Sequence, residues 1–277
     1  RATLTVLVVA HHSSLAYTTF ASSEPRNYRG GTAPIVDTAR WVVLDHAQNF
    51  NDVFFMSALF FISGLFVWGS LKRHGAARFL RDRLVRLGLP FTIGVLVLMP
   101  IAYYAAWLFT GGEPAYPAYW RGNLLEHGFT PGPLWFLWVL LLFDILIAAI
   151  FLAARGVQAP FERLARLGET RPMVLALAVL ALCATAYLPA LAVFGFDAWR
   201  AFLTGPFYFQ TSRLGLYLVW FLIGCAIGAG GFGRSLLKPE GPMARHGGAW
   251  FVAAVVIYLI MDFVPRGLFD AGLLPMP

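Results

Sequence analysis

The chain has 277 residues, of which 59% are hydrophobic and only 13% are charged, and its formal net charge is +7. This composition is far more apolar than that of a soluble domain, so it excludes an ordinary soluble protein and indicates an integral membrane protein. The positive charge would also suit nucleic-acid binding, but the basic residues lie in short segments between apolar runs. Membrane topology explains such segments, and we expect no nucleic-acid partner.

Seven apolar runs each approach the roughly 20 residues that an α-helix needs to cross a bilayer. None shows the short alternation of a barrel strand, so we predict an all-α fold, a polytopic transmembrane helical bundle. We expect one integral-membrane domain over 1–277 that is incomplete at its C-terminal end, since the chain begins without methionine and stops soon after the last run. The predicted spans cover residues 4–20, 53–71, 87–109, 134–154, 173–193, 214–231 and 250–264.

The basic residues sort the connecting segments to two sides of the membrane. Residue 1 and the segments 72–86, 155–171 and 234–245 together hold 14 of the 21 lysines and arginines. Cytoplasmic loops carry the excess of such residues, so the N-terminus is predicted to be cytoplasmic. The segments near 21–52, 110–133 and 194–213 are then expected to face outward.

The first apolar run holds the most informative polar residues, namely Arg1 at its start and the pair His11 and His12. Helix geometry puts Arg1 and His12 on nearly the same stripe, roughly 16 Å apart. An imidazole is expensive to keep in hydrocarbon, and at such depth it usually faces a protein interior or a water-filled cavity. We favour a functional role for the pair, although a hydrogen bond to a neighbouring helix would also explain it.

The most basic segment follows the second span. Arg83 and Arg86 are three residues apart, so on a helix they face the same way. Guanidinium groups can bind phosphates bidentately, which suits a polyanionic ligand at the cytoplasmic surface. Contact with anionic lipid headgroups is the alternative. Together with the stripe from Arg1 to His12, the segment favours ligand binding.

Other polar and aromatic residues support smaller expectations. Asp144 lies in the middle of the fourth span, where a carboxylate needs a histidine, an arginine or a backbone donor as partner; it would orient an imidazole or simply join two helices. Ser63 and Gly64 are expected to permit close helix packing rather than chemistry. Trp135 and Trp138 suit membrane-interface anchors or stacking on a sugar ring. No metal-binding or phosphate-loop pattern is present, so we expect no bound metal.

Four motifs follow one another along the chain. They are R-x10-H at Arg1 and His12, FFISGLF at 60–66, R-x-x-R at Arg83 and Arg86 followed by Pro90, and GPLWFLW at 132–138. In this order and spacing they resemble the membrane acyltransferase-3 family. The segment 205–213 and the His-Ser start of the first outer loop most resemble the branch that includes succinyltransferases of periplasmic glucans.

The resemblance implies an enzyme of the bacterial inner membrane that moves an acyl group, acetyl or succinyl, from cytoplasmic acyl-coenzyme A to a hydroxyl of an extracytoplasmic carbohydrate. Its partners would be this donor, the carbohydrate acceptor and membrane lipid, with acyl-coenzyme A as a co-substrate and no permanently bound cofactor. It assigns the family's catalytic imidazole to His12 and the coenzyme-binding arginines to Arg1, Arg83 and Arg86. His11 lies outside the pattern, which leaves open which imidazole faces the cavity. Family members usually have about ten spans, in agreement with a truncated chain.

Histidine suits this chemistry because it can remove the proton from a sugar hydroxyl at neutral pH. It can also accept the acyl group covalently, and the sequence does not separate the two routes. The main alternative is a transporter or flippase in which His11, His12 and Asp144 relay protons. A non-catalytic scaffold held together by these polar groups is a third possibility.

Overall fold

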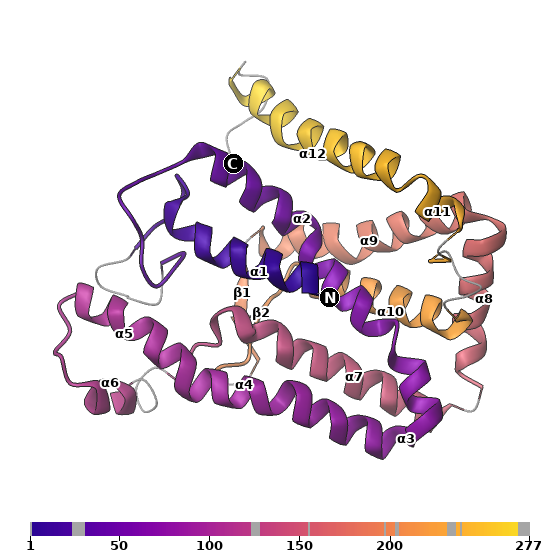
Figure 1. Ribbon diagram of the computed structural model, residues 1–277, viewed down its shortest axis with the longest axis horizontal. Helices are drawn as coiled ribbons and strands as arrows, with labels where there is room; N and C mark the ends of the chain where they lie inside the picture. The colour runs from indigo at the N-terminus through magenta and orange to yellow at the C-terminus, as the bar shows by residue number, and fades with distance from the viewer. Residues whose placement is uncertain are drawn as a thin grey trace.

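The structure is a computed structural model, and long helices dominate it (Figure 1). It describes residues 2–23, 31–122, 128–154, 156–196, 198–202, 205–231, 237–238 and 240–270. The predicted all-α bundle is confirmed, with one short hairpin added among the described residues. The helices are α1 (Ala2–Ser14), α2 (Val42–Gly64), α3 (Val67–Arg83), α4 (Leu89–Ile93), α5 (Met99–Phe109), α6 (Tyr116–Gly122), α7 (Trp135–Ala153), α8 (Gln158–Thr170), α9 (Pro172–Phe194), α10 (Leu214–Gly230), α11 (Pro242–Arg245) and α12 (Gly247–Asp270).

Three helical stretches of the described chain are long and apolar enough to cross a membrane. They are Val67–Phe109, Gly132–Ala153 and Pro172–Phe194. Two shorter apolar helices, Leu214–Gly230 and Gly247–Phe263, follow them. All five overlap predicted spans, which agrees with a polytopic membrane protein.

The second predicted span, 53–71, is wrong at both ends. Helix α2 already begins at Val42 and ends at Gly64, and α3 begins at Val67. The first half of α2 carries polar side chains that contact other segments. They lower the mean hydropathy of this half, so a search for apolar runs does not detect it. The last residues of the predicted span belong to α3.

The third predicted span is part of one long helical stretch that contains two π-helical turns. These turns, Leu84–Gly88 and Gly94–Leu98, lie just before Pro90 and Pro100. A proline has no N–H to donate and its ring crowds the carbonyl four residues earlier, which each wider turn accommodates. The carbonyl four residues before Pro100 belongs to Leu96, and it accepts a hydrogen bond of 2.8 Å from Nε1 of Trp120 instead.

Helices α2 and α10 pack closely in the centre of the bundle. A Cβ added at Gly64 would clash with the carbonyl of Phe221, and one added at Gly224 would clash with the carbonyl of Phe61. The two backbones therefore approach each other where glycines meet, as in small-residue contacts between membrane helices. The expected packing role of Gly64 is confirmed.

The connecting segments gather at two opposite ends of the molecule (Figure 1). Helices α3, α8 and α11 lie toward one end, on the right of the view, and α5, α6 and the start of α2 lie toward the other. The hairpin pairs β1 (Trp199–Ala201) antiparallel with β2 (Tyr208–Gln210), with Trp199 opposite Gln210. The grouping of these helices at two ends agrees with the two sets of connecting segments that the basic residues separate in the sequence.

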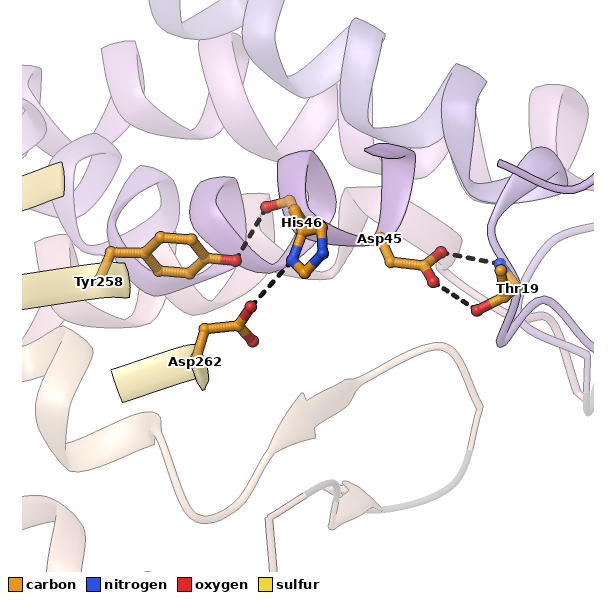
Figure 2. Close-up of polar contacts among 5 residues, drawn as sticks. All are labelled: Thr19, Asp45, His46, Tyr258 and Asp262. Carbon is orange, nitrogen blue, oxygen red and sulfur yellow. Dashed lines mark hydrogen bonds and ion pairs between the residues drawn. The ribbon is translucent and has the colours of Figure 1, made fainter. Parts of the chain in front are cut away.

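Polar contacts fix the start of α2 between two other segments, as Figure 2 shows. Nδ1 of His46 lies 2.8 Å from Oδ2 of Asp262 in α12, and the Tyr258 hydroxyl donates to the carbonyl of His46 at 3.0 Å. On the neighbouring side of α2, the Asp45 carboxylate accepts hydrogen bonds from the backbone N–H and the hydroxyl of Thr19. These contacts explain why polar residues begin this helix.

Candidate active site

The two histidines lie on different sides of α1. Gln48 of α2 donates hydrogen bonds of 2.5 Å to the His11 carbonyl and to the Ser14 hydroxyl. The His11 ring also packs against Phe55 of α2, with 4.9 Å between ring centroids. His12 is more exposed and meets only the edge of the His11 ring among the ring contacts of the described residues, at 5.3 Å. His11 therefore faces the bundle, whereas the R-x10-H spacing points to His12 as the catalytic imidazole.

An ion pair lies beside His11. Nη1 of Arg213, just before α10, donates to Oδ2 of Asp52 in α2 at 2.5 Å. Asp52 is also close enough to His11 to interact with it electrostatically. Burial is the largest single influence and lowers the pKa of Arg213, but Asp52 and Tyr217 together outweigh it and raise the pKa overall, so the guanidinium stays charged.

A cavity of about 320 Å³ lies at the other end of the bundle, along α3. Arg83 and Arg86 both line it, so the structure brings the two predicted arginines together. A π-helical turn begins between them, yet they still reach the same space. The lining residues are Phe66, Ser70, Arg73, His74, Phe79, Asp82, Arg83 and Arg86.

The two arginines differ in how they are held. Nε of Arg83 lies 3.3 Å from Oδ2 of Asp144 in α7, and its guanidinium stacks over the Phe79 ring at 5.0 Å. Arg86 is exposed at the cavity. Arg83 is thus anchored to a neighbouring helix, whereas the charge of Arg86 is open to a ligand.

Asp144 is completely buried, with none of its side chain exposed. The expectation that it needs a partner is confirmed, and the partner is Arg83. Its two carboxylate oxygens make no hydrogen bond within the described residues, so the contact is an ion pair without hydrogen-bond geometry. The alternative in which Asp144 orients a histidine has no contact to support it in the described part of the chain.

Comparison with known proteins identifies the family. The family model described as an acyltransferase domain, of the acyltransferase-3 type, matches residues 1–274. The chain belongs to this family. The protein is therefore an acyltransferase, an enzyme that transfers acyl groups. Comparisons with curated proteins and with solved structures found no match.

The remaining predicted residues of the acyltransferase have these positions. Arg1 lies outside the described residues. The Ser63 hydroxyl donates to the Leu59 carbonyl of its own helix at 2.8 Å, which fits a packing role. Trp135 and Trp138 are each 8% exposed and so lie inside the bundle rather than at a lipid interface. Nε1 of Trp138 donates to the Tyr208 carbonyl and holds the hairpin.

Two polar residues of the acyltransferase escaped prediction, Asp52 and Arg213. Asp52 lies just before the second predicted span, where it looks like part of a polar loop. Arg213 closes the segment 205–213 that carries part of the family resemblance, and this was the one available signal. Among the described residues, no group of three or more histidines, cysteines and acidic residues is placed to hold a metal ion.

Proposed function

We propose that this acyltransferase moves an acetyl or succinyl group from cytoplasmic acyl-coenzyme A to a hydroxyl of an extracytoplasmic carbohydrate across the bacterial inner membrane. The observation that carries the proposal is the cavity shared by Arg83 and Arg86. Coenzyme A bears several phosphate charges, and guanidinium groups are well suited to hold them. The same end of the molecule carries the basic segments that are typical of a cytoplasmic face.

The two arginines have distinct roles in this proposal. Arg86 binds phosphate directly, because its side chain is exposed at the cavity. Arg83 contributes positive charge from a fixed position, because Asp144 and Phe79 hold its guanidinium. We also assign Arg1, which directly precedes α1 in the sequence, as a third cation for the donor.

The chemistry follows from one imidazole of the His11 and His12 pair. The neutral imidazole takes the proton of the acceptor hydroxyl while the hydroxyl oxygen forms a bond to the thioester carbonyl carbon. The bond between this carbon and sulfur then breaks, and the imidazolium returns the proton to the departing thiolate. Desolvation of the imidazole favours its neutral, base-competent form. The motif spacing assigns this role to His12, with His11 beside it.

A covalent route uses the same residues in two steps. The imidazole nitrogen first attacks the thioester and releases coenzyme A, and the acceptor hydroxyl then takes the acyl group from the histidine. Mass spectrometry of protein incubated with donor alone separates the routes. A mass increase of one acyl group on the peptide with His11 and His12 indicates the covalent route.

Orientation is tested by cysteine labelling in intact cells. A cysteine at His74 is expected to react only after the inner membrane is permeabilised, and one at Glu113 to react without permeabilisation. The reason is that the basic segments gather at the His74 end. Labelling of both positions from the same side would contradict the arrangement.

The test of function is release of coenzyme A thiol by the purified protein in detergent, where no gradient exists. With acetyl- or succinyl-coenzyme A and soluble glucose oligosaccharides, we expect thiol release that depends on the oligosaccharide and yields an acylated product. Movement of a substrate that requires a gradient and gives no acyl product would contradict the proposal and indicate a transporter.

A further inference from the structure

Asp52 is a carboxylate in the middle of α2 that is paired on one side and open on the other. Oδ2 accepts the hydrogen bond from Arg213, and Oδ1 has no hydrogen-bond partner within the described residues. The side chain of Asp52 is 40% exposed, whereas that of Arg213 is only 9% exposed. A charge half-way along a helix of a membrane protein is costly unless it faces water or a ligand. The open oxygen is therefore accessible to water or to a ligand that donates a hydrogen bond.

Arg213 holds this carboxylate in a fixed direction. Its guanidinium stacks over the Phe196 ring at 4.7 Å and donates to Asp52 from a buried position. The next turn of α10 supplies Tyr217, which is buried and whose hydroxyl lies 3.3 Å from Oε1 of Gln210 in the hairpin. Such a packed cation limits the rotamers of its partner, which preorganises the carboxylate.

The carboxylate lies on the side of α2 that meets the histidines. Asp52 follows Gln48 by four residues and precedes Phe55 by three, so the three side chains share one face of the helix. Gln48 and Phe55 are the residues that contact His11, and Asp52 interacts with His11 electrostatically. A molecule bound to Oδ1 of Asp52 thus lies on the His11 side of the imidazole pair.

From this arrangement we infer that Asp52, held by Arg213, is the positioning residue that binds the hydroxyl-bearing acceptor beside the histidines. The inference rests on the proposed function. A carboxylate oxygen accepts hydrogen bonds only, so it selects a ligand that donates them, as the hydroxyls of a carbohydrate do. Asp52 holds one hydroxyl so that a neighbouring hydroxyl meets the imidazole. The cavity with Arg83 and Arg86 serves the donor separately.

The experiment measures binding of soluble glucose oligosaccharides to the purified chain by calorimetry, without any acyl donor. Asp52→Asn keeps an oxygen for Arg213 but presents an N–H₂ group to the acceptor. We expect it to weaken binding about 10- to 100-fold, the range for losing a hydrogen bond to a charged group. Asp45→Asn is the matched control, because Asp45 lies on the same helix but binds Thr19, and it is expected to leave the affinity unchanged.

A swapped variant, Asp52→Arg with Arg213→Asp, separates positioning from structure. It restores an ion pair between α2 and the start of α10 but places a cation where the acceptor binds, so binding is expected to stay weak although the protein folds. Wild-type affinity in Asp52→Asn or in the swapped variant would overturn the inference, as would a wild-type chain that binds no oligosaccharide. A wild-type chain that binds the oligosaccharides but releases no thiol from acyl-coenzyme A would overturn the proposed function instead.

Discussion

The two polar regions of the bundle are built in opposite ways. Near the cavity the protein presents an excess of positive charge, because Asp144 pairs with Arg83 while Arg86 is left open. Beside α1 the charges are balanced, since Arg213 is paired with Asp52 and the imidazoles of His11 and His12 can be neutral. An excess of cations suits binding of a polyanion, whereas a balanced, partly buried cluster suits proton transfer. This difference supports the proposal that donor binding and acyl transfer use separate regions of the bundle.

Removing the imidazoles is expected to have the largest effect on acyl transfer and no effect on donor binding. His12→Ala should lower acyl transfer about 10²- to 10⁴-fold, the usual loss for a missing general base, while the donor still binds. His11→Ala is expected to be milder. Thiol release by each purified variant, with Ser13→Ala as the neighbouring control, measures the difference. If His11→Ala abolished transfer and His12→Ala did not, the orientation of His11 toward α2 would identify the catalytic imidazole.

Removing Arg83 should lower the stability of the protein as well as its affinity for the donor. Asp144 is completely buried, and its charge would lose its partner, which costs about 3 to 5 kcal/mol for a buried pair. Arg83→Ala is therefore expected to unfold at a lower temperature in detergent. Adding Asp144→Asn should recover most of that stability but not donor affinity. A double variant no more stable than Arg83→Ala would show that the pair does not hold α3 to α7.

Replacing Arg86 is expected to change donor binding without changing stability, because Arg86 is exposed and has no buried partner within the described residues. Arg86→Ala should weaken donor binding by about 1.5 to 3 kcal/mol, as expected for a charge-assisted hydrogen bond. Lysine should rescue only part of this loss, since an ammonium lacks the planar fork of a guanidinium. The check is a donor titration at saturating acceptor, with exposed Arg81→Ala as the control outside the cavity. A reduced acceptor affinity with unchanged donor affinity would disprove the assignment.

The smallest effect is expected where α2 and α10 meet between the two regions. A Cβ at Gly224 would overlap the Phe61 carbonyl, and overpacking of this kind costs typically 1 to 3 kcal/mol. Gly224→Ala should thus lower the unfolding temperature and reduce donor binding and transfer together. Gly69→Ala in α3 is the control, because only the end of the Arg73 side chain lies near its added methyl. A Gly224→Ala protein as stable as wild type would show that the close contact is dispensable.

Sequence alone predicts the helices whose apolar residues run along their whole length. The spans 134–154, 173–193 and 214–231 match α7, α9 and α10 closely, because hydropathy reports burial in lipid directly. The first half of α2 was missed, since its polar residues are satisfied by α1 and α12 and a sequence does not show such partners. Helix α8 was missed as well, because its amphipathic stretch looks like a basic loop. Strands of three residues, as in the hairpin, carry too short a pattern to detect.

The sequence predicted only part of the site, because it shows local spacing but not the contacts between helices. The R-x-x-R spacing placed Arg83 and Arg86 in one region, and the need of Asp144 for a partner follows from the cost of burying a charge. Which partner it finds depends on how α3 packs on α7, and that requires tertiary structure. The Asp52 and Arg213 pair joins residues far apart in the chain, so no local spacing predicts it.

The most direct test of the separation between the two regions is donor binding by a protein without the imidazoles. Calorimetry with acetyl- and succinyl-coenzyme A should show that a variant with both His11→Ala and His12→Ala binds the donor as tightly as wild type but releases no thiol. Adding Arg86→Ala to it should weaken binding at least about tenfold, the lower bound for losing one charge-assisted hydrogen bond. Loss of donor binding in the histidine variant, or unchanged binding after Arg86→Ala is added, would contradict the account.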